Sequence, residues 1–225
     1  MLTETGYELF FNRDEQLSRT LAIPPKFYQA EQAIYPVDPE GEGTWIATNE
    51  KGCTIVLLNY YQAVNKNKIC ISRGQIILSL LKNENSTIEG LNDLELNQYQ
   101  PFQLCIFSEN LSINEAEVES VIWDGSRLIH TDIDLPITSS SINYCQVKQK
   151  RQSRFNQLVG LKEPQSAQLK EFHYSKEILE QYSVNMLRED ARTVSISHII
   201  VGKNISFEYF DNILNKSHII SSERN

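Results

Sequence analysis

The chain has 225 residues, and its 21 lysine and arginine residues against 29 aspartate and glutamate residues give a formal net charge of −8. A surface that holds nucleic acid must be basic, so this charge argues against a nucleic-acid partner. No apolar run approaches the roughly 20 residues that a transmembrane segment needs, and the first residues resemble no secretory signal. We therefore expect a single cytoplasmic domain over residues 1–225.

The first part of the chain contains signals for a strand, a loop and a hairpin. Residues 7–11 are aromatic and apolar, which predicts a strand that leads into the polar residues after it. Residues 21–39 hold four of the seven prolines and predict an extended surface loop. Residues 44–48 and 53–59 predict two strands joined through a turn in which Gly52 takes a positive φ.

The rest of the chain alternates helices and hairpins. Ser72 is suited to cap a helix over the apolar-periodic stretch after it, and a weaker helix is expected at residues 88–96. Strands are expected at residues 103–107, 118–123, 127–130, 193–201 and 205–209, and helices at 143–161 and 164–174. The polar tail, residues 215–225, is expected to be frayed. Antiparallel hairpins interleaved with helix pairs predict an α+β layered fold with helices on the sheet faces.

Cysteine and histidine residues show no metal-binding pattern. The cysteines are Cys53, Cys70, Cys105 and Cys145, and the histidines are His130, His173, His198 and His218. No CxxC pair occurs, and no histidine has a partner at helical ligand spacing. Glycine fingerprints for nucleotides are absent as well. We therefore expect reduced thiols, structural histidines, no metal and no cofactor.

Two charged clusters and one serine run are candidate functional segments. Asn12, Arg13, Asp14 and Glu15 follow the first predicted strand. Two carboxylates, an amide and a guanidinium are costly to bury unless they pair with one another. They form either a surface salt-bridge cluster or a site at a strand end, and residues 188–192 leave the same alternatives. The three serines at 139–141 are either a catalytic run or, as we favour, a loop before the next helix.

Taken together, these segments resemble the NRDE family, also called the transport and Golgi organisation 2 family. The family is named after the motif that residues 12–15 form here. The further matches, in the family's order, are residues 43–47, 53–59, 72–74, 139–141 and 183–195. Each motif is weak alone, but the ordered set is specific.

That family is similar to the N-terminal-nucleophile hydrolases of the choloylglycine and penicillin V acylase type. Residues 49–52, Asn-Glu-Lys-Gly, and Asn59 after them resemble a hairpin of those acylases and the asparagine that ends it. The resemblance implies an αββα sandwich of two antiparallel sheets between helical layers.

The resemblance also implies a mechanism. An N-terminal cysteine attacks an amide carbonyl, and its own α-amino group acts as the base. By position, Asn59 would donate to the oxyanion and Asp14 would hold the amino group of the nucleophile. Asn12 and Arg13 would support this site, and a distal arginine, Arg188 or Arg192, is expected.

The start of the chain departs from the family pattern. Family members begin Met-Cys, whereas this chain begins Met1-Leu2. We expect the nucleophile strand to lie upstream, by about one strand length of ~5–6 residues. The alternative is a true loss of the nucleophile. In either case, residues 7–11 should lie beside a gap or an unpaired sheet edge.

The function implied is hydrolysis of a non-peptide C–N bond, such as that of an acylated amine. The alternative is a non-catalytic lipid- or haem-handling protein that uses the same fold as a binding pocket. The expected partner is a small-molecule substrate or a lipid-like ligand, and the sequence does not indicate the oligomeric state. If the resemblance holds, Asp14 and Asn59 should face one cleft, at most ~10 Å apart.

Overall fold

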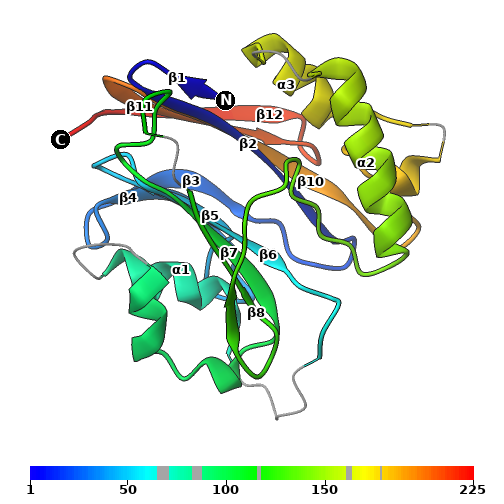
Figure 1. Ribbon diagram of the computed structural model, residues 1–225, viewed down its shortest axis with the longest axis horizontal. Coiled ribbons are helices and arrows are strands. Elements are labelled where there is room, and N and C mark those ends of the chain that lie inside the picture. The colour runs from blue at the N-terminus through cyan, green and yellow to red at the C-terminus, as the bar shows by residue number, and fades with distance from the viewer. Residues whose placement is uncertain (65–70, 83–87, 116–117, 161–163, 178) are drawn as a thin grey trace.

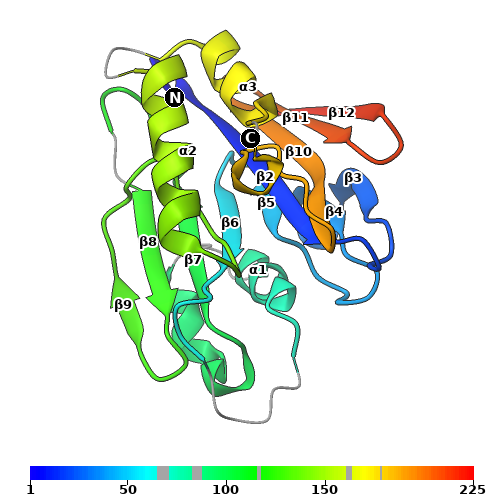
Figure 2. The ribbon, with the colours of Figure 1, turned by 90° about the vertical axis from the view of Figure 1, so that its right-hand side faces the viewer.

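The computed structural model describes residues 1–64, 71–82, 88–115, 118–160, 164–177 and 179–225. Two antiparallel sheets lie face to face, one of five strands and one of seven (Figure 1). Helices α2 and α3 cover the outer face of the five-stranded sheet, and α1 lies on the far side of the seven-stranded sheet (Figures 1 and 2). This arrangement confirms the predicted αββα sandwich.

The five-stranded sheet holds the polar motif of residues 12–15. Its order is β1 (Leu2–Thr3), β2 (Gly6–Gln16), β10 (Ala191–Val201), β11 (Asn204–Asp211) and β12 (Lys216–Glu223). β2 is longer than expected because β10 pairs with it as far as Gln16, so the motif lies within the strand and not after it. The expectation of a frayed tail was wrong. Residues 216–223 pair with all of β11, and this backbone pairing orders a segment whose side chains are mostly exposed.

The seven-stranded sheet contains the two predicted hairpins. Its order follows the chain: β3 (Ile23–Tyr28), β4 (Ala33–Val37), β5 (Ile46–Asn49), β6 (Thr54–Asn59), β7 (Phe102–Phe107), β8 (Val118–Trp123) and β9 (Leu128–His130). Gly52 takes the expected positive φ of 89° in the turn between β5 and β6. The predicted loop at residues 21–39 is instead the hairpin of β3 and β4. Pro24 and Pro25 are tolerated because β3 is an edge strand with an irregular register between Ile23 and Lys26, and Pro36 lies beyond the part of β4 that pairs with β5.

The helices form two groups. Near the seven-stranded sheet lie α1 (Gly74–Leu81) and the 3-10 helices η1 (Ile88–Asp93) and η2 (Leu96–Gln98), and the other group is α2 (Tyr144–Leu158), α3 (Ser166–Tyr174) and the 3-10 helix η3 (Glu180–Tyr182). Arg73, not Ser72, occupies the N-cap position of α1 and makes no side-chain cap bond. Among the described residues, no helix has the length and apolar character needed to cross a membrane.

Three apolar clusters hold the layers together. The first joins α1 to the seven-stranded sheet and includes Ile76, Ile77 and Leu80. The second fills the space between the sheets, where Ile199 and Phe207 meet residues of β4, β5 and β6. The third packs α2 and α3 on the five-stranded sheet around residues such as Phe10, Leu169, Phe172 and Ile196.

One edge of β2 is open along most of its length. β1 pairs only with Gly6 and Tyr7, and Met1 continues the pairing through two hydrogen bonds with the backbone of Glu8, of 2.7 and 2.8 Å. Beyond Glu8, no strand of the described chain pairs with this side of β2. The unpaired edge expected beside residues 7–11 is therefore present, and it continues through the polar motif.

Candidate active site

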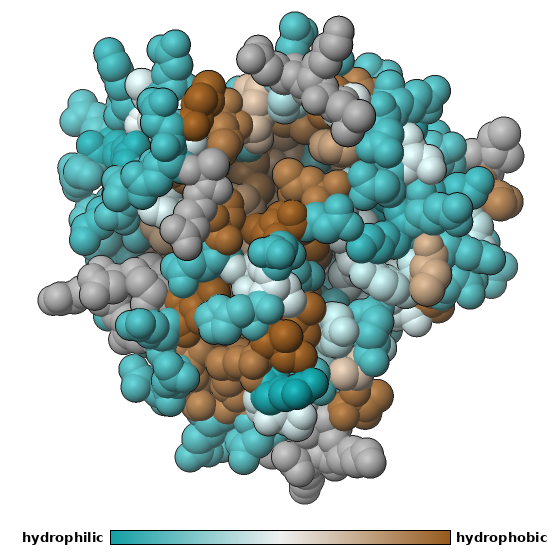
Figure 3. All heavy atoms as spheres, in the orientation of Figure 1, coloured by the Kyte–Doolittle hydropathy of each residue, from teal (hydrophilic) through white to brown (hydrophobic). Residues whose placement is uncertain are grey.

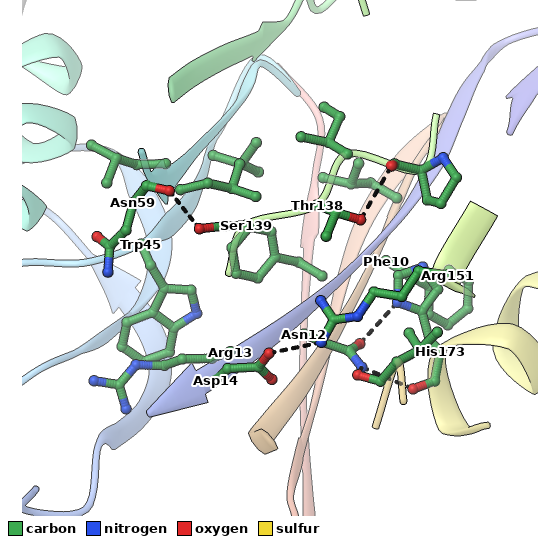
Figure 4. A pocket seen from close by; sticks show the side chains of 18 of the residues that line it. Phe10, Asn12, Arg13, Asp14, Trp45, Asn59, Thr138, Ser139, Arg151 and His173 are labelled. Carbon is green, nitrogen blue, oxygen red and sulfur yellow. Dashed lines mark hydrogen bonds and ion pairs between the residues drawn. The ribbon is translucent and has the colours of Figure 1, made fainter. Parts of the chain in front are cut away.

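A cavity of about 1380 Å³ lies alongside β2. Its lining comes from both sheets, from α2 and α3, and from the segment 131–141 that connects β9 to α2 (Figure 4). The upper part of the face in Figure 3 is hollowed, and hydrophobic side chains line the hollow. The volume exceeds the roughly 300–1,000 Å³ of common small-molecule sites, so the cavity has room for an extended ligand.

The side chains of β2 alternate between the two faces of its sheet. Tyr7, Leu9 and Phe11 pack in the apolar cluster between the sheets, whereas Phe10 packs in the cluster formed with α2 and α3. Opposite the polar motif, the register of β10 shifts between Thr193 and Ser195. Such bulges re-aim side chains and are common beside functional sites.

Both carboxylate oxygens of Asp14 have a fixed donor. Arg151 of α2 donates to Oδ2 across 3.2 Å, and the Thr193 hydroxyl of β10 donates to Oδ1 across 2.5 Å. The Thr193 hydroxyl is oriented in turn by the Met186 N–H, at 2.8 Å. A carboxylate accepts up to about four hydrogen bonds, so Asp14 retains acceptor capacity on an open strand edge. An ammonium group is the natural partner for that capacity.

Asn12 is fully engaged with the protein. Its Nδ2 donates to the carbonyl oxygens of His173 and Val184, each at 2.9 Å, and its Oδ1 lies 2.8 Å from Nδ1 of His173. Because Oδ1 can only accept, the His173 ring must carry its proton on Nδ1. Asn12 therefore joins β2 to α3 and to the segment after η3, and it holds the backbone beside Asp14 in place.

Burial keeps His173 neutral. Its ring lies between Phe10, stacked at 5.2 Å, and Phe172, in edge contact at 5.1 Å. This desolvation, with a smaller contribution from the charge of Arg151, lowers the pKa of His173 to about 3. The ring acts as a hydrogen-bond donor to Asn12 in this structure, not as a charged group.

Arg13 connects the polar motif to the other sheet. The guanidinium lies 4.1 Å from the ring centroid of Trp45 and pairs with Glu15 at 3.1 Å and Asp38 at 3.8 Å. Only 7% of Arg13 is exposed. This side chain braces the end of β2 and contributes little free donor capacity to the cavity.

Asn59 lines the same cavity as Asp14, from the end of β6 in the opposite sheet (Figure 4). Its Nδ2 donates to the Tyr61 hydroxyl at 2.8 Å, and its backbone carbonyl oxygen accepts from the Ser139 hydroxyl. The serine run lies in a loop that lines the cavity, and its Ser139 holds the end of β6. The Asn59 amide has a donor that a ligand oxygen can take over from Tyr61.

Of the two distal arginines expected from the sequence, one reaches the cavity. Arg188 lines it and pairs with Asp190, with Nε 2.9 Å from Oδ1. Arg192 lies in β10 and does not line the cavity.

The cysteines that the structure describes lie away from the cavity. Cys53, just before β6, and Cys105, in β7, are buried, and this burial raises the pKa of Cys53 to about 12 and that of Cys105 to about 11. Cys145 is exposed on α2, and Cys70 lies outside the described residues. The described part of the chain contains no group of three or more His, Cys, Asp or Glu side chains that could hold a metal ion.

The sequence analysis missed Arg151 and His173 as site residues. Arg151 stands in the buried face of α2, four residues after Val147 and four before Phe155. A charged residue in an apolar helical stripe requires a partner of opposite charge, and that signal was available in the sequence. His173 had no comparable signal, because its role depends on contacts with β2.

Comparisons with known proteins agree with this architecture. The chain is similar to a mutant conjugated bile acid hydrolase from Clostridium perfringens, whose crystal structure aligns over 97% of this chain and 90% of that one with a TM-score of 0.53 and 14% sequence identity. This likeness shows a shared N-terminal-nucleophile hydrolase-like fold. No curated protein matches the chain. The family model described as Transport and Golgi organisation 2 matches residues 4–201, and the chain therefore belongs to that family.

Proposed function

We propose that this protein supplies the fold and the supporting site residues of an N-terminal-nucleophile hydrolase that cleaves a non-peptide amide bond. The observation that carries the proposal is the position of Asp14, a carboxylate held on the open edge of β2 and lining the same cavity as Asn59. Because the described cysteines lie elsewhere, the nucleophile would come from a strand that pairs with this edge.

The register of β1 supports this placement. Leu2 pairs with Tyr7 and Thr3 pairs with Gly6, so each step back along β1 moves the pairing one residue forward along β2. A strand that continues this pairing backwards from Met1 would place the residue about six positions before Met1 opposite Asp14. That spacing agrees with the length of one strand, which the family resemblance implied.

In this arrangement the groups have distinct roles. A cysteine thiol opposite Asp14 would lose its proton to its own α-amino group and attack the amide carbonyl, forming a carbon–sulfur bond. Asp14 would hold the amino group, and Asn59 would donate to the carbonyl oxygen as negative charge develops there. The amine would leave with the transferred proton, and water would then release the acid from the thioester. Arg151 and Thr193 would act by positioning Asp14.

The second candidate is a binding protein for a lipid-like ligand without catalysis. The observation that favours it is the apolar lining near the first residues of β2, where Leu9 and Phe11 meet Leu111, Ile133 and Ile137. Both candidates use the same cavity, so the decisive difference is turnover.

The test is to precede Met1 with about seven residues, Met-Cys followed by strand-forming residues, so that the cysteine stands six positions before Met1, and to assay release of fluorescent 7-amino-4-methylcoumarin from its decanoyl amide. We expect turnover with cysteine and none when alanine replaces it. In the active protein, Asn59→Ala should lower kcat by roughly 100- to 1,000-fold. Binding of decanoate without any turnover would overturn the hydrolase and favour the second candidate.

A further inference from the structure

Five arginines line the cavity: Arg13, Arg19, Arg73, Arg151 and Arg188. Four of them form ion pairs with carboxylates: Arg13 with Glu15 and Asp38, Arg19 with Glu15, Asp38 and Glu40, Arg151 with Asp14, and Arg188 with Asp190. Arg73 has no such ion pair among the residues that the structure describes. The cavity wall at Arg73 therefore differs from the wall at the other four arginines, because its guanidinium has no described carboxylate partner.

Arg73 lies next to the end of β6. Its Nη1 donates to the carbonyl oxygen of Pro101 at 3.1 Å, and the same oxygen accepts from the N–H of Tyr60, at 3.1 Å, the residue after Asn59. Among the residues that the structure describes, Nη2 and Nε of Arg73 have no hydrogen-bond partner, and neither is a buried unsatisfied atom, so both can donate to a ligand. The bond to Pro101 anchors the guanidinium, and its remaining N–H donors point outward in the plane of the group.

The backbone around Arg73 is tightly held. The N–H of Thr44 donates to the carbonyl oxygen of Gly74 at 3.1 Å, and a Cβ on Gly74 would lie 2.9 Å from the nitrogen of Thr44. Only glycine permits this approach of the two chains. Because Gly74 follows Arg73 directly, the close contact fixes where the arginine side chain begins.

Burial lowers the pKa of Arg73, and the nearby Tyr61 and Glu15 offset this effect only in part. A partly desolvated guanidinium without a carboxylate is less stable than a paired one, so an anion that enters the cavity would be stabilised there. Guanidinium groups match carboxylates best, through two parallel hydrogen bonds.

We propose that Arg73 determines ligand specificity by binding a carboxylate of the ligand. The cavity then orders an amphiphile along β2. An aliphatic chain lies against Leu9, Phe11 and Ile133, and the carboxylate lies at Arg73, which is within electrostatic reach of Glu15 near the other end of β2. This inference rests on the proposed function in one respect: the amide bond to be cleaved would lie between the aliphatic chain and the carboxylate of the ligand. The ligand class is therefore an aliphatic acyl group joined to an amino acid.

Binding can be measured without catalysis. Isothermal titration of the 225-residue chain with N-decanoylglycine and with its neutral counterpart, N-decanoylethanolamine, compares a carboxylate with a hydroxyl on the same acyl chain. We expect the carboxylate ligand to bind at least tenfold more tightly, and Arg73→Gln to remove that preference while leaving the affinity for the neutral ligand unchanged. Arg127→Gln is the matched control, since Arg127 is exposed in the β8–β9 hairpin and lies outside the cavity.

Each outcome decides the point. Equal affinities for the two ligands, or a preference that survives in Arg73→Gln, would overturn the role of Arg73. Failure of both ligands to bind would overturn the amphiphile class. Thermal unfolding of Arg73→Gln near that of the parent chain shows that a lost preference is not a folding defect. The coumarin assay remains a separate measure of the proposed hydrolysis, because decanoyl coumarin amide carries no carboxylate.

Discussion

Arg151 of α2 and Asp14 of β2 form an ion pair of 3.2 Å although 137 residues separate them in the chain. Arg151 also donates from Nε to the carbonyl oxygen of Ser183, at 3.0 Å. One side chain thus connects the helical layer, the segment after η3 and the open-edge strand. This connection holds the Asp14 carboxylate where the cavity meets the unpaired edge.

Replacing Arg151 should therefore destabilise the fold. Arg151→Ala removes two charge-assisted hydrogen bonds and leaves the Ser183 carbonyl with one donor fewer. We expect the free energy of unfolding to fall by about 1–3 kcal/mol, measured by urea denaturation. Arg127→Ala, which removes a largely exposed arginine, should change it by less than about 1 kcal/mol. Equal effects of the two substitutions would show that the Arg151 contacts contribute no more than a surface pair.

His173 should make stability fall in mild acid. Its pKa is lowered to about 3 in the folded protein, chiefly by burial, against ~6.5 when unfolded. Its contribution is therefore fully present above pH 6.5 and is lost progressively as the pH falls from 6.5 towards 3, because only the unfolded chain takes up the proton. Between pH 7 and pH 5 this amounts to about 1–2 kcal/mol. His173→Gln should flatten that part of the curve of unfolding free energy against pH, whereas His130→Gln, at an exposed position of β9, should not.

Arg13 should not tolerate lysine. The planar guanidinium both lies over the Trp45 ring and pairs with Glu15, and an ammonium group cannot reproduce these two contacts together. Arg13→Lys should lower the free energy of unfolding by about 1–2 kcal/mol and shift the fluorescence of Trp45. The fluorescence is best read in a Trp123→Phe background, because Trp123 is the other tryptophan. A stability and spectrum unchanged from that background would mean that the ring contact is dispensable.

The layers of the fold were predictable because they depend on local patterns. Gly52 and the apolar run of β6 are adjacent in sequence, so the hairpin that ends at Asn59 could be predicted with its turn. The strand at residues 216–223 could not, because its exposed side chains carry little apolar signal and its order comes from pairing with β11. The β3 strand was hidden by Pro24 and Pro25, which an edge strand accepts.

The site was predictable only in part for the same reason. The motif placed Asn12, Arg13 and Asp14 together, yet alternation within a strand sends Arg13 towards Trp45 and the other two towards the helices. If Arg13 influences Asp14, it therefore does so by holding the backbone of β2, not by direct contact between the two side chains. The distal partner of Asp14 proved to be Arg151, whose position follows from how α2 packs on the sheet.

The last prediction concerns the open edge of β2. Its unpaired N–H and C=O groups lie beside Leu9 and Phe11, both only partly buried, so a strand added there would gain backbone hydrogen bonds and cover apolar surface. Covering a large apolar side chain contributes about 1.5–3 kcal/mol, against a total stability of roughly 5–15 kcal/mol. A chain preceded by about six alternating apolar and polar residues should therefore show a urea midpoint higher by roughly 0.5 M or more, and it should aggregate less on heating. The matched control carries six glycine and serine residues, which add the same length without strand propensity and should leave the midpoint unchanged. Equal midpoints for the two extended chains would show that the edge accepts no strand, and the placement of the nucleophile opposite Asp14 would fall with it.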